Sequence, residues 1–151
     1  MTEQLSKVYE PKEIEKQANE IWNSGKYFHA EPPLKGGQQT EPYTIVIPPP
    51  NVTGVLHMGH VINYTIGDVI TRYKLLRGYN VLSPMGWDSF GLPAENAAIR
   101  TGVHPHEFTE QNIGRMTEQM HRAGWGYDWS RELATSHPDY YKWTQWIFLK
   151  F

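Results

Sequence analysis

The hydrophobic positions along the chain predict a strand followed by a long helix. Residues 43–47 (YTIVI) are apolar or β-branched without a break, which is typical of a fully buried strand. Prolines 48–50 end this strand, because proline has no N–H to donate to a β-ladder. Apolar residues then recur at three- and four-residue steps, and Gly78 stands where a helix C-cap is expected. These apolar positions are Met58, Ile62, Ile66, Val69, Tyr73 and Leu76.

A second parallel strand is predicted at residues 79–83 (YNVLS), so that strand, helix and strand form a right-handed βαβ unit. Apolar residues at helical spacing predict four further helices, at residues 11–24, 92–99, 109–123 and 138–151. We expect the first of these helices to pack on the sheet. We expect the third to bury Met116 and Met120, since a methionine stripe is more often core than site.

Three connecting segments lie between these elements. Residues 31–42 are polar and rich in glycine and proline, which predicts a link into the first strand. Residues 100–107 (RTGVHPHE) are interpreted as a loop, and with no third ligand nearby we take His104 and His106 as loop residues rather than metal ligands. The aromatic turn at residues 125–129 (WGYDW) is expected to serve packing.

Composition limits the classes of protein that fit. The chain has 151 residues, 39% of them hydrophobic and 20% charged, as expected for one soluble globular domain. It has no cysteine, and no apolar run that is long enough to cross a bilayer. The polar N-terminus lacks a signal peptide's apolar region, so the cytoplasm is the expected location. The net charge is −2 without a Lys/Arg cluster, so this chain alone is not expected to grip nucleic acid tightly.

Candidate chemistry begins at the start of the central helix. His57 and His60 are three residues apart and therefore share a face, and Gly59 leaves that face open to a flat ligand. Imidazoles at a helix N-terminus donate to phosphate oxygens, aided by the free N–H groups and the dipole. The pattern thus suits stabilisation of charge at the α-phosphate of a nucleotide. A metal half-site and plain helix surface remain alternatives.

Asp88 lies just beyond the second predicted strand. In α/β sheets, ligands bind beyond the carboxyl ends of the strands. A carboxylate there would hold the ammonium group of an amino acid through a charge-assisted hydrogen bond. An Asx-turn or a helix N-cap explains the same residue equally well, because a glycine and a helix follow it.

Several long motifs resemble those of one enzyme family. PPPNVTGVLHMGH, ending at His60, resembles the HIGH signature of class I aminoacyl-tRNA synthetases. NYTIGDVITRY from Asn63, GWDSFGLPAENAA from Gly86 and YYKWTQWIFLKF from Tyr140 resemble the leucyl-tRNA synthetases in particular. The similarity runs from about Tyr9 to the last residue.

The resemblance implies a fold and a reaction. The fold would be the first half of a Rossmann-like (HUP-type) α/β domain with parallel strands and flanking helices. Residues 1–42 would form an N-terminal helix and linker, and residues 43–151 the first half of the catalytic domain, truncated before the editing insertion. The reaction would be activation of leucine by ATP to leucyl-adenylate and its transfer to tRNA(Leu). A missing C-terminal half would carry the KMSKS loop.

The resemblance also implies roles for individual residues. His57 and His60 would be catalytic and would bind ATP phosphates, and Gly59 would carry the adenine. Asp88 would bind the ammonium group of leucine. Backbone in the run from Pro49 and Pro50 to Asn51 would line the amino-acid pocket. Mg²⁺ would enter with ATP, with no dedicated protein site.

Departures from the family pattern leave alternatives. The PPPNVTG run is the form associated with valyl and isoleucyl enzymes, whereas GWDSFG is the leucyl form, so a valine- or isoleucine-type fragment is the nearest alternative. A pocket distinguishes one methylene by only about 1–3 kcal/mol. The aromatic last helix, which has no polar cap, also fits an inactive half-domain that needs a complementary chain. A small nucleotidyltransferase shares the HxGH element but would not need GWDSFGLPAEN.

Overall fold

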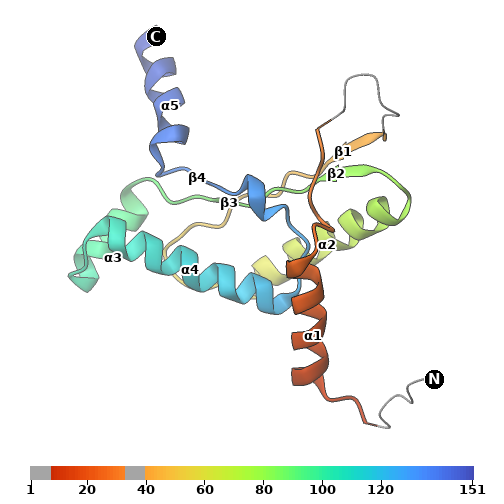
Figure 1. Cartoon of the computed structure of the whole chain (residues 1–151). Helices are drawn as coiled ribbons and strands as arrows, with labels where there is room; N and C mark the ends of the chain where they lie inside the picture. Colours follow the sequence, from red (N-terminus) through yellow and green to blue (C-terminus); the bar gives the residue numbers. More distant parts are fainter. Residues whose placement is uncertain (1–7, 33–39) are drawn as a thin grey trace.

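The computed structural model describes residues 8–32 and 40–151 (Figure 1). The strands are β1 (Pro42–Thr44), β2 (Asn80–Leu82), β3 (Gly86–Trp87) and β4 (Leu133–Ala134). The helices are α1 (Pro11–Ser24), α2 (Met58–Leu76), α3 (Leu92–Thr101), α4 (Pro105–Ala123) and α5 (Pro138–Lys150), with a 3₁₀ turn, η1, at Trp129–Arg131. Among the described helices, none has the length and apolar character that a membrane span requires.

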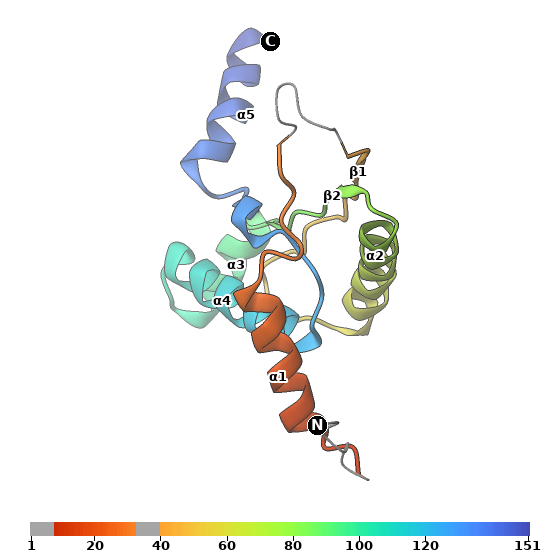
Figure 2. The same ribbon diagram turned by 45° about the vertical axis from the view of Figure 1, so that its right-hand side comes forward.

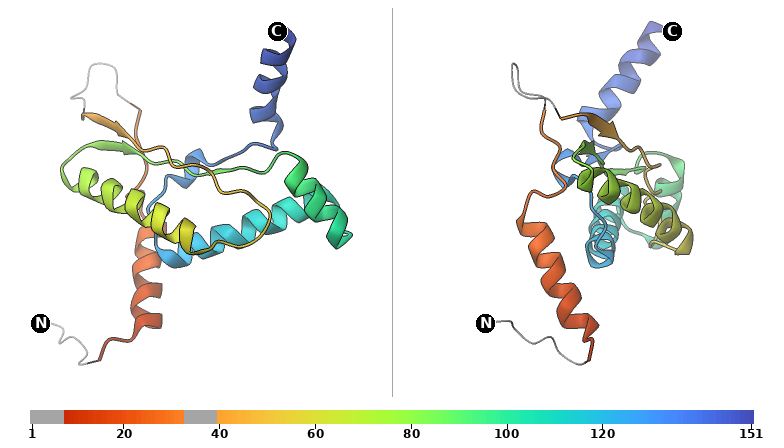
Figure 3. Two further views of the ribbon diagram at one scale, coloured as in Figure 1. Left: turned by 180° about the vertical axis from the view of Figure 1, so that it is seen from behind. Right: turned by 90° about the vertical axis from the view of Figure 1, so that its right-hand side faces the viewer.

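All strand pairs in the described residues are parallel. β1 pairs with β2, with Tyr43 opposite Val81, and β3 pairs with β4. The segment that contains β2 and β3 thus has a neighbour on each side, and helices flank these strands (Figure 3). Prolines 48–50, which follow β1, interrupt its pairing with the β2 segment, because proline supplies no N–H. The predicted parallel βαβ unit is confirmed.

The first strand is shorter and more exposed than predicted. The prediction of a fully buried strand at residues 43–47 is wrong, because β1 ends at Thr44 and Val46 is 82% exposed. Ile45 still donates its N–H to the Leu82 oxygen at 3.0 Å. In the described part of the chain only β2 pairs with β1, so one side of this strand is an open sheet edge.

The core lies where α2, α4 and the strands meet. It is dominated by large side chains from distant parts of the sequence. Its buried members are Val52, Tyr64, Met85, Trp87, Met116, Met120, Trp125, Tyr127 and Ala134. The predicted burial of the two α4 methionines and the packing role of the aromatic turn are confirmed.

Helix α2 has the predicted bounds but buries a different face. Its buried residues are Tyr64, Gly67 and Thr71, whereas the apolar stripe is exposed, with Leu76 at 88%. Gly67 allows the Ile47 side chain to approach the helix closely, because a Cβ at this position would force that side chain to shift. The apolar stripe predicted the helix correctly, but the face of α2 that is buried is the one with Tyr64, Gly67 and Thr71.

Helix α1 packs on a helix and not on the sheet, so the prediction of sheet packing is wrong. It packs chiefly on α4, none of its residues is buried, and Ile21 is 57% exposed. Trp22 lies against the turn that follows α4, where Gly124 has a φ of 73° and leaves room for the indole ring. Figure 2 shows α1 reaching away from the strands.

The loop predicted at residues 100–107 is largely helical. Helix α3 continues to Thr101, and α4 begins at Pro105. His104 caps α4 by accepting the N–H of His106 at Nδ1, at 3.3 Å, and proline suits the first helical position. Within the described ranges, no group of three His, Cys, Asp or Glu side chains is arranged to hold a metal ion.

Helix α5 projects from the molecule (Figures 1 and 2). It begins at Pro138, as predicted, and contains no buried residue. Its large apolar side chains are exposed, among them Trp143 at 61% and Phe148 at 78%.

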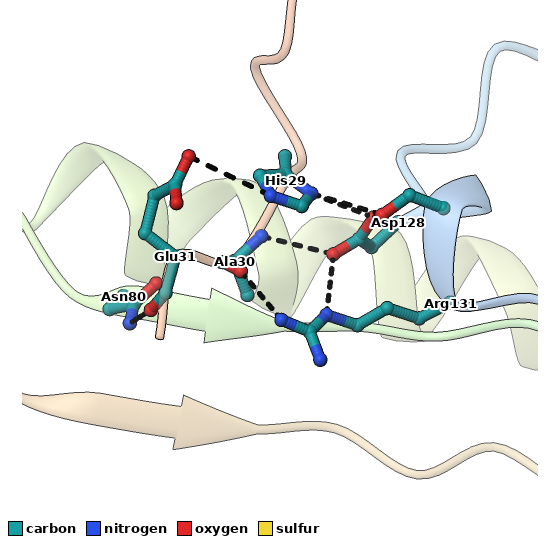
Figure 4. A network of polar contacts seen from close by, with 7 residues as sticks. His29, Ala30, Glu31, Asn80, Asp128 and Arg131 are labelled. Atoms are coloured by element: carbon teal, nitrogen blue, oxygen red, sulfur yellow. Dashed lines mark hydrogen bonds and ion pairs between the residues drawn. The ribbon is translucent and has the colours of Figure 1, made fainter. Parts of the chain in front are cut away.

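A buried carboxylate joins the segment after α1 to the η1 turn (Figure 4). Asp128 is 2% exposed and accepts the Ala30 N–H at 3.0 Å and the Ser130 hydroxyl at 2.6 Å. His29 Nδ1 lies 3.2 Å away, and Arg131 Nε 3.3 Å. Burial raises the pKa of Asp128, but hydrogen bonds, led by that of Ser130, outweigh it and leave the pKa below its usual value.

Candidate functional site

The two histidines of the central motif form the N-terminal cap of α2. His57 is the N-cap residue, with extended backbone, and its Nδ1 accepts the Gly59 N–H at 3.1 Å. His60 accepts the His57 N–H at its own Nδ1, also at 3.1 Å. The two rings lie against each other at a tilt, with centroids 3.9 Å apart and 35° between their planes. Each imidazole therefore satisfies one of the backbone N–H groups that a helix start leaves free.

This capping fixes which ring nitrogen carries the proton. An Nδ1 that accepts a backbone N–H has no hydrogen, so each neutral ring carries its hydrogen on Nε2. Burial, followed by the nearby His57, lowers the pKa of His60 and favours the neutral ring. The pair thus presents two Nε2–H donors at the positive end of a helix, the arrangement that suits an anionic oxygen.

Gly59 has a structural role that the sequence did not indicate. A Cβ at Gly59 would lie 2.9 Å from Cε1 of His57, so any larger residue would displace the capping ring. The ring of His57 lies beside Gly59, which is itself exposed. Its proposed contact with adenine stays a prediction.

The residues predicted to bind the amino acid come together across a parallel β-bridge. Asn51 pairs with Asp88. The Asp88 N–H donates to the Pro50 oxygen at 2.9 Å, and the Val52 N–H donates to the Asp88 oxygen at 3.1 Å. Pro50 is buried, whereas the side chains of Asn51 and Asp88 are exposed. Pro49 is also exposed and lies beside Gly86.

The N-cap alternative for Asp88 is wrong. Helix α3 is capped by Gly91, which has a φ of 134° and makes no side-chain cap. The turn after Asp88 is held from the β4 side, where Thr135 Oγ1 accepts the Ser89 N–H at 2.9 Å. The carboxylate of Asp88 thus stands exposed on a backbone that hydrogen bonds fix on both sides.

Two supporting residues were missed by the sequence reasoning. Gln119 of α4 accepts the Leu56 N–H at 3.2 Å and so holds the approach to the histidine cap. Thr135 supports the Asp88 turn. Both contacts join distant parts of the chain, and no local pattern signals them.

A partly open cavity of about 340 Å³ lies away from these residues. It is bounded by α1 and the turn that follows α4, with Trp22, Phe28 and Trp129 among its walls. None of the predicted site residues lines it. A more open cleft is lined by residues of α3 and by Thr53, which is two residues after Asn51 in the chain.

Comparisons with known proteins agree with this arrangement. The family model for class I tRNA synthetases (I, L, M and V) matches residues 17–151. A leucine–tRNA ligase of Halorhodospira halophila is 54% identical over 97% of the chain and 17% of its own length. One of Thermotoga maritima is 51% identical over 95% of the chain, again 17% of its own length.

A solved structure shows the same fold. It is the ternary complex of the Agrobacterium radiobacter K84 agnB2 LeuRS with tRNA and LeuAMS. The TM-score is 0.86 at 40% identity, over 95% of this chain and 18% of that one. The predicted α/β class with parallel strands and flanking helices is therefore confirmed.

These findings place the chain in a family. It belongs to the class I tRNA synthetases. Within that class it is similar to the leucyl-tRNA synthetases, and it spans 17% of the length of the curated relatives named above. The resemblance expected from the sequence motifs is confirmed.

Proposed function

We propose that this chain supplies the phosphate-binding and ammonium-binding part of a leucine-activating site. The observation that carries the proposal is the histidine cap of α2, with two Nε2–H donors at a helix start. The Asn51–Asp88 bridge, which lies outside the named strands, adds an exposed carboxylate. Similarity to leucine–tRNA ligases at about half identity supports leucine over valine or isoleucine as the substrate.

In the proposed reaction, the carboxylate of leucine attacks the α-phosphate of ATP and pyrophosphate leaves. His57 and His60 donate from Nε2 to phosphate oxygens, where negative charge builds in the transition state. Asp88 holds the ammonium group through a charge-assisted hydrogen bond. Gly59 carries the adenine.

The amino-acid pocket begins at the backbone of Pro49, Pro50 and Asn51. In this proposal Mg²⁺ enters bound to ATP rather than at a dedicated protein site. Its contribution is to neutralise phosphate charge. Transfer of leucine to tRNA(Leu) follows in the proposed sequence, and the net charge of −2 supports a tRNA grip that lies outside this chain.

The experiment that tests this proposal is amino-acid-dependent exchange of pyrophosphate into ATP by the purified chain. Leucine, valine, isoleucine and methionine are each supplied, and the double variant His57→Ala/His60→Ala is the control. We expect exchange that prefers leucine and disappears in the double variant. Exchange led by valine or isoleucine would contradict the proposed substrate.

A second candidate is a half-site that acts only with a complementary chain carrying the KMSKS loop. Helix α5 favours it, because its aromatic side chains are exposed as in a surface that awaits a partner. One relative, from Aquifex aeolicus, is named leucine–tRNA ligase subunit alpha and is 50% identical over 97% of this chain. A folded chain without exchange activity would support this candidate.

A further inference from the structure

The ring of His60 has two other rings as neighbours. The ring of His57 lies at a centroid distance of 3.9 Å and an angle of 35°. The ring of Tyr64 lies at 5.7 Å and 32°. Tyr64 is one helical turn further along α2, so its ring extends back toward the helix start, where His60 lies.

Tyr64 is itself firmly held. It is 1% exposed. The rings of Trp125 and Tyr127 meet it edge-on, at 5.4 Å and 6.4 Å. Trp125 is fixed in turn by donating its indole N–H to the Thr65 hydroxyl at 3.1 Å. Tyr64 is therefore a rigid part of the core that ends at the ring of His60.

The ring of Tyr64, rather than its hydroxyl, makes this contact. The hydroxyl oxygen is buried without a hydrogen-bond partner among the described residues. Burial raises the pKa of Tyr64 to about 12, so the group stays neutral in the ordinary pH range. A hydroxyl without a partner has no donor or acceptor role toward His60, and phenylalanine preserves everything that touches the imidazole.

We propose that Tyr64 is a positioning residue for His60. Its ring keeps the imidazole against that of His57, with Nδ1 accepting the His57 N–H and Nε2–H on the other side of the ring. Without this support the imidazole rotates about its side-chain bonds, and the Nε2–H group no longer points in a fixed direction. The consequence for catalysis rests on the proposed function, whereas the control of the His60 ring does not.

The direct test is nuclear magnetic resonance of the chain with ¹⁵N-labelled histidine. In the unmodified chain we expect ring-to-ring proton contacts between Tyr64 and His60, and a single tautomer of His60 with its hydrogen on Nε2. In Tyr64→Leu we expect the two ring nitrogens of His60 to give averaged signals. Tyr64→Phe should keep the unmodified pattern.

A matched control separates positioning from loss of core packing. Tyr127→Leu removes a buried tyrosine from the same cluster but leaves the ring that touches His60. We expect this variant to lose stability and to keep the His60 tautomer. A locked tautomer in a folded Tyr64→Leu, or no ring contact in the unmodified chain, would overturn the proposal. The measurement of the ring contact uses the unmodified chain, so it does not depend on whether a variant folds.

Exchange kinetics give a separate readout. Tyr64→Leu should lower kcat by about 10-fold or more with little change in the KM for ATP. The reason is that the hydrogen bond from Nε2–H stabilises the transition state more than bound ATP, so its loss affects chiefly kcat. Tyr64→Phe should retain kcat, and an equal loss in both variants would overturn the proposal. If the unmodified chain shows no exchange, the proposed function fails, and the tautomer measurement still decides the role of Tyr64.

Discussion

Asn51 and Asp88 face each other across a parallel β-bridge, with one backbone hydrogen bond on each side of the pair. One of these bonds uses the oxygen of Pro50, which is the last residue of the proline run. The prolines interrupt the ladder between β1 and β2, and the bridge resumes it beyond them. Main-chain hydrogen bonds therefore fix the position of Asp88, and its exposed carboxylate takes no part in them.

This placement makes Asp88 a clean target for substitution. In Asp88→Asn we expect leucine binding to weaken by about 10- to 100-fold, because the ammonium loses a charged hydrogen-bond partner. The midpoint of urea unfolding should not change, since the side chain is exposed. Titration calorimetry with leucine and ATP measures the loss.

Glu95→Gln is the matched control for this prediction, because Glu95 is an exposed carboxylate on α3 outside the bridge. It should bind leucine as the unmodified chain does. Equal affinities in Asp88→Asn and the unmodified chain would remove Asp88 from the proposed site.

Asp128 should dominate the acid stability of the chain. Its pKa is lowered in the folded state, so its contribution to the free energy of unfolding is present above the usual value of 3.8 and is lost as the pH falls through the lowered pKa. We expect Asp128→Asn to cost about 2–4 kcal/mol near pH 7, because it leaves hydrogen-bonded partners mismatched.

The pH dependence distinguishes this account from simple loss of packing. Urea unfolding at a series of pH values should show the stability of the unmodified chain falling below about pH 4, with a smaller fall in Asp128→Asn. Parallel curves for the two proteins would contradict the assigned role.

Arg72 should join three parts of the structure. Its guanidinium donates to Asp68 at 2.8 Å and to the Gly124 oxygen at 2.6 Å, and lies over the rings of Trp22 and Phe28. We expect Arg72→Lys to cost about 1–3 kcal/mol in urea unfolding, because an ammonium reproduces the charge but not the fork or the stacking. Arg115→Lys, on the exposed face of α4, is the control and should change little. Equal stabilities of Arg72→Lys and the unmodified chain would show that only the positive charge of Arg72 matters.

The order of elements was predictable because it is encoded locally. Proline and glycine mark most element ends, and α1, α2 and the start of α5 lie where apolar spacing places them. Burial was not predictable in the same way. Val46 lies beyond the end of β1 at Thr44 and is exposed, and the apolar stripe of α2 is exposed because its Gly67 face is the one that packs.

The candidate site was predictable in its parts and not in its geometry. The spacing of His57 and His60 indicated a shared helix face, but the reciprocal cap through Nδ1 depends on backbone conformation at the helix start. The position of Asp88 after a strand indicated a ligand, but its bridge with Asn51 is a long-range pairing. The loop interpretation of residues 100–107 failed because proline and His104 were not recognised as a helix start.

Helix α5 should control association of the isolated chain. Its apolar residues are exposed, and none of its residues is buried. We expect concentration-dependent association in analytical ultracentrifugation, and its reduction in Trp146→Lys/Phe148→Lys, since contiguous apolar patches drive binding. The same substitutions should leave the unfolding midpoint unchanged. A monomer at all concentrations would show that the exposed face has no such effect.

The central claim is that the histidine cap and the Asn51–Asp88 bridge form one leucine-activating site. Calorimetric titration with a non-hydrolysable leucyl-adenylate analogue tests it most directly, because this ligand spans both parts. We predict binding that is about 10-fold or more tighter than that of the valyl analogue, and that weakens in both Asp88→Asn and His57→Ala/His60→Ala. Binding that is the same for both analogues, or unaffected by either variant, would contradict the account.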